Sequence, residues 1–302
     1  MRDLSAIVVT LGDDPRVHQC LEALAAAWPS AHLQLVLVEN GAQGPAPPLP
    51  IEPAVRLRRA ANPGFAQAVN EGLAVSTGDL ILTLNPDARV EADAVATAVR
   101  TLDGESGAGA VAFRLVRPGA TLLDSAGIRL GLIRRARDRG MGQPASGQFL
   151  ERADVDAACM ACALFDPAAL HDARDGAGEI LDSRYFAYKE DVDLGWRLRR
   201  AGYRIVYEPA AVAEHQRGWR EGERKAIPRR LRVLSLRNRW FTILKNESPL
   251  SLFLRMALYV PTECGLLAWL AITEPGVLRA YPRILAGFWE TMRRRKLRAD
   301  LG

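Results

Sequence analysis

Cysteine is scarce in this chain of 302 residues, which contains only four. They form no even, loop-rich framework of the kind that staples small secreted domains, so we expect a reducing compartment. Cys159 and Cys162 make a single Cys-x-x-Cys pair on an expected buried strand, and no second pair accompanies them. Core packing is therefore favoured for this pair, with a redox or zinc role as the alternative.

A targeting signal and internal repeats are also lacking. The chain enters an apolar run by Leu4, too early for a signal peptide, and we expect a cytoplasmic protein. With 49% hydrophobic residues it can bury one good-sized core or two small ones. The segment GAQGPAPPLP, residues 41–50, predicts a proline-rich surface loop.

Strand and helix patterns alternate through the first third of the chain. Aliphatic runs at 4–10, 34–38 and 80–84 predict short buried strands. Helical patterns follow them at about 14–28, 67–76 and 91–102, the first opened by Asp14 and Pro15. This alternation predicts an α/β fold with a mostly parallel sheet flanked by helices.

Oxygen-rich side chains follow the predicted strands. In open parallel sheets, ligands bind off the carboxyl ends of the strands. The residues expected there are Thr10, Glu39, Asn40, and Asn85 with Asp87. This set suits a ribose, a base edge and a divalent cation better than a bare phosphate.

The stretch 184–215 combines a helical pattern with a strand. Glu190, Asp191 and Asp193 lie in the first turn of the predicted helix, arginines lie in its last turn, and Gly202 ends it. These features alone describe a surface helix. Aromatic residues on both sides and His215 at the end of the next strand instead favour a general base with a partner that positions it.

Three blocks carry a family resemblance. ANPGFAQAVNEGL (61–73), GDLILTLNPDARVEADAV (78–95) and YFAYKEDVDLGWRLRRAGYRIVYEPAAVAEH (185–215) resemble the signature blocks of the family 2 inverting glycosyltransferases. DSAGIRLGLIRRARDRGMGQP (124–144) resembles a further block of that family. The likeness covers about 4–245 and is nearest to bacterial rhamnosyltransferase-like members. It implies the GT-A fold, the nucleotide-diphospho-sugar transferase fold, with a catalytic domain over residues 1–221.

The resemblance also implies roles for individual residues. Thr10, Glu39 and Asn40 would contact the nucleoside of a sugar nucleotide, and Asn62, Gly64 and Asn70 would lie beside its diphosphate. Asn85 and Asp87 match the first and last positions of a metal-binding triplet. Asp87 and His215 would hold Mg²⁺ or Mn²⁺, mainly through diphosphate oxygens. Asp191, behind Glu190, matches the base, and Arg217 is a second candidate for the diphosphate, with an ordinary turn arginine as the alternative.

Two positions depart from the family pattern. Cys159 and Met160 stand where serine and glycine are commoner, and Asp166 with Pro167 stands where paired arginines are usual. Acceptor contacts are therefore not transferred to this segment.

The carboxyl-terminal part of the chain is strongly basic. From residue 216 onward there are 18 Lys and Arg against 7 Asp and Glu, a net charge of +11, whereas the whole chain carries +5. The patterns predict helices at about 222–245, 249–271 and 276–297, within a segment 222–302. Its middle helix is apolar but interrupted by Arg255, Pro261 and Glu263. Apolar helices flanked by arginines are typical of peripheral attachment to an anionic membrane, and the alternative is a soluble helical subdomain.

The expected activity is transfer of a sugar, with rhamnose the one suggested, from a dTDP-, UDP- or GDP-sugar. The acceptor would be a glycan or polyprenyl-linked molecule in surface polysaccharide synthesis, reached at the inner face of the cell membrane. A homodimer is a further expectation. A sugar-phosphate nucleotidyltransferase is disfavoured because its first strand should be followed by a glycine- and arginine-rich loop, whereas the loop here is LGDDP. A non-catalytic scaffold stays open, and nucleic-acid binding is disfavoured because the tail carries no known binding motif.

Overall fold

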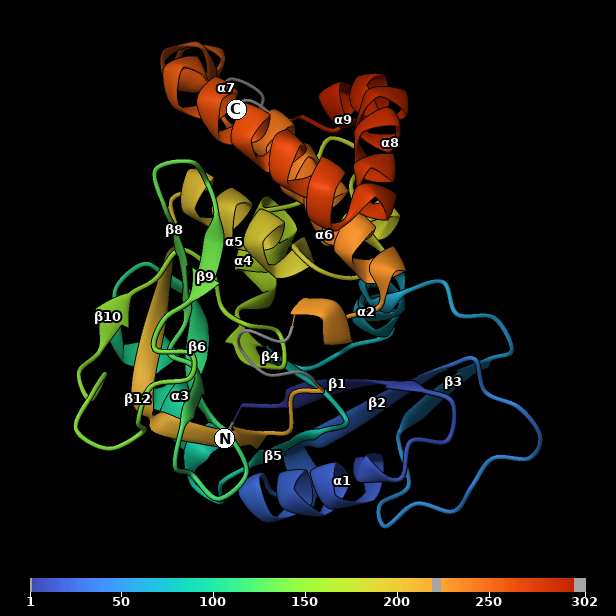
Figure 1. Ribbon diagram of the computed structural model, residues 1–302. Coiled ribbons are helices and arrows are strands. Elements are labelled where there is room, and N and C mark those ends of the chain that lie inside the picture. The colour runs from blue at the N-terminus through green and yellow to red at the C-terminus, as the bar shows by residue number, and fades with distance from the viewer. Residues whose placement is uncertain (1, 219–223, 296–302) are drawn as a thin grey trace.

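The computed structural model describes residues 2–218 and 224–295 (Figure 1). The strands are β1 (Leu4–Leu11), β2 (Leu33–Asn40), β3 (Val55–Arg59), β4 (Leu80–Leu84), β5 (Ala88–Val90), β6 (Ala108–Val116), β7 (Leu123–Ser125), β8 (Ile128–Leu130), β9 (Ala136–Asp138), β10 (Ala153–Asp154), β11 (Cys162–Phe165) and β12 (Arg204–His215). The α-helices are α1 (Arg16–Ala27), α2 (Phe65–Ala74), α3 (Ala94–Gly104), α4 (Pro167–Asp172), α5 (Glu190–Arg200), α6 (Arg229–Asn246), α7 (Pro249–Thr273), α8 (Ala280–Ala286) and α9 (Phe288–Arg293).

One large mixed sheet forms the centre of the molecule. Its strand order is β10-β12-β6-β11-β4-β1-β2-β3. The strands β3, β2, β1 and β4 are parallel, as their uninterrupted apolar runs predict, and β12 is parallel to β6. β11 runs antiparallel between β4 and β6, which makes the sheet mixed. The predicted α/β fold, with a sheet flanked by helices and followed by helices, is confirmed.

Both faces of the sheet are buried. Along β1, Leu4, Ala6 and Val8 face a core that includes residues of α1 and α3, whereas Ile7 and Val9 face a second core that includes residues of α2, α4 and α5. This alternation is the two-residue period of a strand. It explains why the strand reads as continuously apolar instead of alternating between apolar and polar residues.

The helix α5 matches the predicted boundaries but is not a surface helix. Its acidic first turn and basic last turn are present, and Gly202 follows with φ of +99°. However, Glu190, Asp193 and Arg197 are buried. The reason is that α6 packs against α5, a contact that the local helical pattern does not encode.

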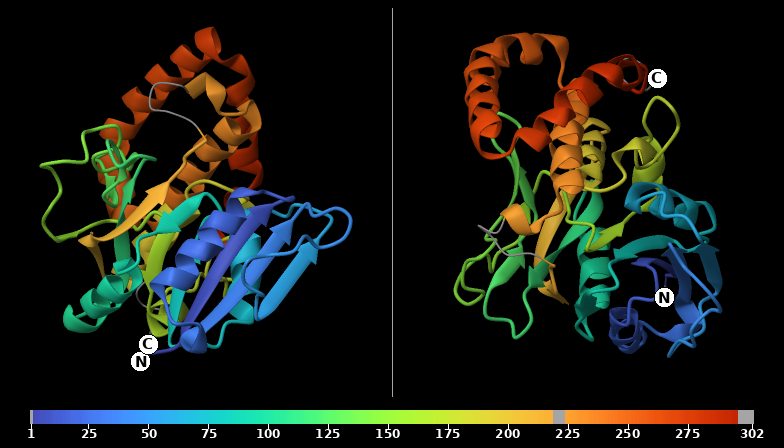
Figure 2. Two further views of the ribbon diagram at one scale, coloured as in Figure 1. Left: turned by 90° about the horizontal axis from the view of Figure 1, so that it is seen from below. Right: turned by 45° about the vertical axis from the view of Figure 1, so that its right-hand side comes forward.

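The carboxyl-terminal helices partly differ from the prediction. α7 continues through Pro261, but the third predicted helix is divided into the 3-10 turn η4 (Pro275–Arg279), α8 and α9. Gly287 separates α8 from α9, and a Cβ there would clash with the Phe241 ring. Figure 2 shows α7, α8 and α9 together at one end of the molecule, joined to the α/β part through α6.

Candidate functional site

A histidine and an aspartate meet where β5 pairs with β12. The antiparallel register sets His215 opposite Ala88, so the imidazole lies beside Asp87, which directly precedes β5. His215 Nε2 lies 3.4 Å from Asp87 Oδ1, and the N–H of Gln216 donates to the Asp87 carbonyl at 2.9 Å. Asn85 follows β4, and its carbonyl accepts from the N–H of Ala88 at 3.0 Å.

Two further carboxylates and an arginine extend this cluster. Asp124 Oδ2, from β7, lies 2.7 Å from His215 Nδ1, and Asp124 is fully buried. Arg217 Nε lies 2.8 Å from Asp124 Oδ1, and Arg217 Nη2 lies 3.3 Å from Asp138 Oδ2 in β9. A carboxylate behind a histidine fixes the orientation of the ring. Asp124 therefore fixes the ring so that Nε2 is directed to Asp87.

The charges of the cluster stabilise one another. Burial lowers the pKa of His215, but hydrogen bonds to Asp124 and Asp87 outweigh that effect and raise it to about 9. Burial alone would raise the pKa of Asp124, but the hydrogen bond from His215 and the charge of Arg217 hold it below its usual value. The histidine is therefore an imidazolium between two carboxylates at neutral pH.

Asp87 and His215 fit a divalent cation as two of its ligands. Among the residues described, no group of three or more His, Cys, Asp or Glu side chains could hold a metal ion by itself. Mg²⁺ often takes one or two protein carboxylates and completes its shell with water and substrate phosphates. His215 has the carboxylate-backed arrangement of a metal-bound imidazole, although binding would require its Nε2 proton to leave. Arg16 Nη1 lies 3.2 Å from Asp87 Oδ2 on the other side.

Glu190 and Asp191 begin α5 and have different surroundings. Burial raises the pKa of Asp191, Lys189 lowers it, and the charges of Asp138 and Arg217 also act on it. Asp191 is therefore within electrostatic range of Asp138 and Arg217, which belong to the histidine cluster. Burial and the charge of Asp191 raise the pKa of Glu190 to about 8, and its Oε2 atom has no hydrogen-bond partner among the described residues. The pKa of both neighbouring carboxyls is therefore raised, and Asp191, on which the charge of Arg217 acts, is the candidate base.

The third carboxylate of this helix has structural contacts only. Asp193 Oδ2 lies 2.8 Å from Lys245 Nζ and accepts from Arg197 at 2.9 and 3.0 Å. Its Oδ1 accepts from Asn246 at 2.7 Å. Burial raises the pKa of Asp193, but Arg197 and Lys245 outweigh burial and lower it. Asp193 holds α5 against α6.

The residues predicted to contact a nucleoside lie at the carboxyl ends of β1 and β2. Thr10, Glu39 and Asn40 are each 3% exposed. Glu39 is paired with Arg56 at 2.8 Å and with Arg58 at 3.0 Å. The Asn40 Oδ1 atom is buried and has no hydrogen-bond partner in the described part of the chain. The structure thus brings these three residues to one edge of the sheet.

The residues predicted for the diphosphate have different positions. Asn62 Oδ1 accepts from the N–H of Gly64 at 2.9 Å, and Gly64, with φ of +103°, directly precedes α2. The Asn40 amide donates to the Gly64 carbonyl at 3.4 Å. Asn70 donates to the carbonyl of Leu181 at 2.6 Å and accepts from its N–H at 2.9 Å. Asn70 therefore anchors the segment around Leu181 to α2.

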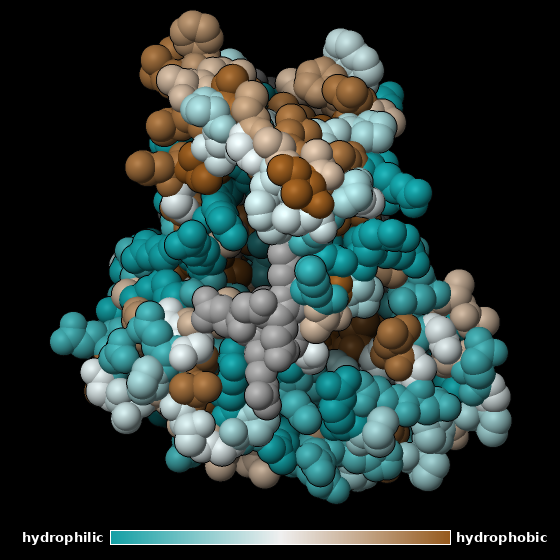
Figure 3. All heavy atoms as spheres, viewed as in Figure 1, coloured by the Kyte–Doolittle hydropathy of each residue, from teal (hydrophilic) through white to brown (hydrophobic). Residues whose placement is uncertain are grey.

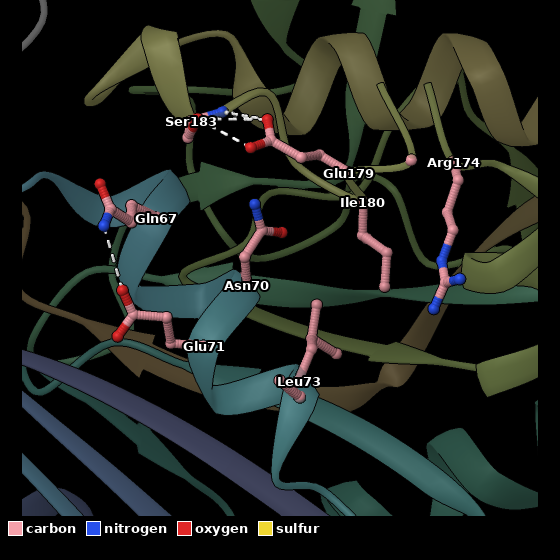
Figure 4. Close-up of a pocket in the computed structure, with 10 residues that line it drawn as sticks. Gln67, Asn70, Glu71, Leu73, Arg174, Glu179, Ile180 and Ser183 are labelled. Atoms are coloured by element: carbon pink, nitrogen blue, oxygen red, sulfur yellow. Dashed lines mark hydrogen bonds between the residues drawn. The ribbon is translucent and has the colours of Figure 1, made fainter. Parts of the chain in front are cut away.

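A pocket of about 440 Å³ lies apart from this cluster, between α2 and the segment 174–183 (Figure 4). Asn70 is the one predicted donor residue that lines it. Its other walls include Gln67 and Glu71 of α2, with Glu179 and Ile180 opposite them. The pocket contains neither the Asp87–His215 pair nor Asp191.

Three charged residues of the cluster were not singled out from the sequence. Asp124 and Asp138 lie inside the quoted block 124–144, and Arg16 lies in the first predicted helix. The available signal was the position of the two aspartates in a family-like block. Their pairing with His215 and Arg217 depends on the contacts of β7 and β9, which the sequence pattern does not reveal.

Comparisons with known proteins agree with this architecture. The family model described as "Glycosyl transferase family 2" matches residues 5–173, more than half of the chain. The N-acetylglucosaminyl-diphospho-decaprenol L-rhamnosyltransferase of Mycobacterium tuberculosis (strain ATCC 25618 / H37Rv) is 25% identical over 240 residues, which are 72% of this chain and 78% of that protein.

Two solved structures share the fold. GalNAc-T7 with UDP, GalNAc and Mn²⁺ has a TM-score of 0.58 at 12% identity, covering 81% of this chain and about half (49%) of that one. The mannosyltransferase PcManGT from Pyrobaculum calidifontis, in complex with GDP-Man and Mn²⁺, has a TM-score of 0.54 at 17% identity, covering 99% and 85%. Fold, sequence match and order of the blocks agree: this chain belongs to glycosyl transferase family 2 and has the GT-A fold.

Proposed function

We propose that the protein moves a sugar, with rhamnose as the first candidate, from a nucleoside-diphosphate donor to a polyprenyl-linked glycan with inversion. The observation that carries this proposal is the cluster in which His215 lies against Asp87 and Asp124, and Arg217 against Asp124 and Asp138. The charges of Arg217 and Asp138 act on the carboxyl of Asp191 at the start of α5. A candidate base is thus within electrostatic range of Arg217, a cation suited to a diphosphate. The mycobacterial relative, whose name specifies rhamnose and a decaprenyl-linked substrate, supports the choice of sugar and acceptor.

The residues act on the two ends of the displacement. Asp191 accepts the proton of the acceptor hydroxyl while that oxygen attacks the anomeric carbon from the face opposite the diphosphate. The bond from the anomeric carbon to the diphosphate oxygen breaks, and the sugar is inverted. Arg217 stabilises the charge that gathers on the leaving diphosphate. A Mg²⁺ or Mn²⁺ ion held by Asp87 and His215 would supply further positive charge there.

The donor lies, in this proposal, across the carboxyl ends of β1, β2 and β4. Thr10, Glu39 and Asn40 face the nucleoside, and Asn40 Oδ1, which has no partner among the residues described, suits a hydrogen-bond donor of a base or ribose. Asn62 and Gly64 shape the backbone beside the diphosphate.

The carboxyl-terminal helices suit attachment to a membrane surface. Among the helices described, α7 is long and apolar enough to cross a membrane by length and composition. One of its faces is already occupied, because Glu263 accepts from Trp240 at 3.2 Å and from Tyr281 at 3.1 Å. We therefore infer that α7 lies along the membrane surface instead of spanning it.

The free face of these helices is apolar and has basic neighbours. Apolar side chains gather at this end of the molecule (Figure 3). The most exposed include Phe253 (74%) and Ile272 (85%) of α7 and Trp289 (77%) of α9. Exposed Arg279 and Arg283 lie in η4 and α8. Apolar contact combined with positive charge is the requirement for an anionic membrane surface, where a polyprenyl-linked acceptor would be presented.

A panel of sugar nucleotides tests the proposal. Purified protein is incubated with dTDP-, UDP- and GDP-sugars and a polyprenyl-diphosphate-linked N-acetylglucosamine acceptor, and released nucleoside diphosphate is measured. With dTDP-rhamnose we expect release of nucleoside diphosphate that depends on the acceptor. NMR of the product should show an anomeric configuration opposite to that of the donor. Release without an acceptor indicates a hydrolase, and no release with any donor supports the scaffold alternative.

A further inference from the structure

The turn that leads into the candidate base has an unusual backbone. Phe186, Tyr188 and Lys189 have φ of 64°, 70° and 76°. Residues other than glycine rarely adopt this left-handed region, and they keep it only where their surroundings impose it. Glu190 and Asp191 follow immediately. The direction in which α5 starts therefore depends on whatever holds this turn.

A single side chain of α6 contacts most of the turn. The Asn238 amide nitrogen lies 2.9 Å from the carbonyl oxygen of Tyr185, 3.1 Å from that of Ala187 and 2.8 Å from that of Tyr188. Its two hydrogens are shared among these three acceptors. The Asn238 oxygen accepts from Arg237 Nε at 3.0 Å, which fixes the orientation of the amide, and Asn238 is fully buried.

The start of α2 holds the opposite side of the turn. The N–H of Phe65 donates to the Phe186 carbonyl at 2.6 Å. A Cβ on Gly64 would come within 2.6 Å of that same oxygen, so only glycine permits this approach. The turn is thus enclosed between Asn238 and the loop that carries Asn62 and Gly64.

We propose that Asn238 is a positioning residue for catalysis, which holds the turn 185–189 and thereby sets the location of Asp191. This inference rests on the proposed role of Asp191 as base. The remainder of α5 has separate anchors, since Lys245 and Asn246 bind Asp193. Loss of the Asn238 amide therefore releases the turn and the first residues of α5 without detaching the helix.

The chemical step is more sensitive to this release than donor binding. A misplacement of a reacting group by about 1 Å costs about 10²-fold in rate. The residues expected to bind the nucleoside lie at the ends of β1 and β2, and the loop expected beside the diphosphate is held separately by hydrogen bonds of Gly64 to Asn62 and Asn40. None of these residues contacts Asn238 directly in the hydrogen bonds of the described residues. The effect should therefore fall on kcat more than on the donor KM.

The test compares Asn238→Leu, similar in size but without a donor, with Asn238→Gln, which keeps the amide on a longer side chain. Val233→Ala is the matched control, because Val233 is also buried in α6 but packs against Leu270 and Val277. We expect Asn238→Leu to lower kcat by about 10- to 100-fold with the donor KM changed by less than about 3-fold. Asn238→Gln should recover part of kcat, and Val233→Ala should lower Tm while kcat stays near that of the wild type.

Asp191→Asn, measured in parallel, tests the role of Asp191 separately from that of Asn238. If Asp191→Asn retains wild-type kcat, Asp191 is not the base, and the proposal that Asn238 positions the base is overturned as well. If Asp191→Asn is inactive while Asn238→Leu has the kcat of Val233→Ala, Asn238 is a structural residue only. Should Asn238→Leu not fold, Asn238→Gln gives the same decision, since an unchanged kcat with a displaced amide also overturns the proposal.

Discussion

Lys245 and Asp193 form an ion pair in the interior, with Lys245 Nζ 2.8 Å from Asp193 Oδ2 and both side chains at most 1% exposed. The same ammonium lies 3.1 Å from Asp182, and Arg294, beyond α9, lies 3.2 Å from Asp175. Buried charges of the carboxyl-terminal segment are therefore neutralised by the α/β part. Shortening the chain after Lys245 would remove α7 and also Arg294, which neutralises buried Asp175. Point substitutions are therefore better probes of the face that is expected to bind the membrane.

Replacing Lys245 by methionine should destabilise the protein severely. Removing one partner from a buried ion pair typically costs about 3–5 kcal/mol, because the remaining charge is left uncompensated. Arg197 still faces Asp193, which favours the lower end of that range. The free energy of unfolding is measured in urea. Arg293→Met is the matched control, since Arg293 is 78% exposed and should contribute less than about 1 kcal/mol; equal losses in the two variants would contradict the prediction.

Asp87→Asn should abolish the response to divalent cations. The substitution removes the charge beside His215 Nε2 while keeping the side-chain size. Activity of the wild type should require Mg²⁺ or Mn²⁺, and the variant should lose about 10²-fold or more in kcat at every metal concentration. Glu91→Gln, on an exposed residue after β5, is the control. Full wild-type activity in chelator would exclude the metal assignment.

Asp191→Asn should lower kcat by about 10²–10⁴-fold and leave donor affinity nearly unchanged, because a general base acts in the chemical step. Calorimetry with the nucleoside diphosphate measures donor affinity separately. A collapse of that affinity would make Asp191 a binding residue and place the base elsewhere.

Glu190 should make the protein less stable as pH rises. Its pKa is raised from 4.5 to about 8 by burial and by the charge of Asp191. Between these values the folded state holds a proton that the unfolded state releases, so the free energy of unfolding falls with increasing pH. The limit for one proton is about 1.4 kcal/mol per pH unit. Glu190→Gln should show a flatter dependence in urea titrations across this window, and parallel curves would show that Glu190 is ionised in the folded protein.

Substitutions on the exposed apolar face should impair membrane binding selectively. Phe253→Ser combined with Trp289→Ser removes two exposed aromatic side chains, whereas Leu150→Ser changes an exposed leucine (61%) outside the carboxyl-terminal helices. The double variant should lose binding to anionic vesicles in sedimentation and most transfer to a lipid-linked acceptor, yet keep donor binding. Wild-type binding should weaken with salt. Unchanged vesicle binding in the double variant would favour the soluble subdomain.

The sequence was sufficient for the strands β1, β2 and β4 and for the polar residues at their carboxyl ends. Aliphatic runs at β1, β2 and β4 need burial on both faces, which only a covered sheet provides. The charge pattern of α5 likewise follows from the local helix dipole. These properties are local, and each is encoded within a few consecutive residues.

The division of roles among charged residues is not local. Glu190, Asp191 and Asp193 have the same chemistry and lie close together in sequence. Asp193 nevertheless pairs with Lys245, the pKa of Glu190 is raised by burial and by Asp191, and Asp191 is within electrostatic range of Arg217. Each outcome depends on which element packs against that face of α5.

The sequence by itself determined the fold class, the family and the candidate oxygen ligands, because apolar periodicity and motif order survive in one dimension. Tertiary structure alone decided that Asp124 backs His215, that Asn238 holds the turn before Asp191, and that α6 joins the catalytic part. The physical reason is that a pKa, an ion pair or a strained turn depends on distances between segments, which the chain sets only when it folds.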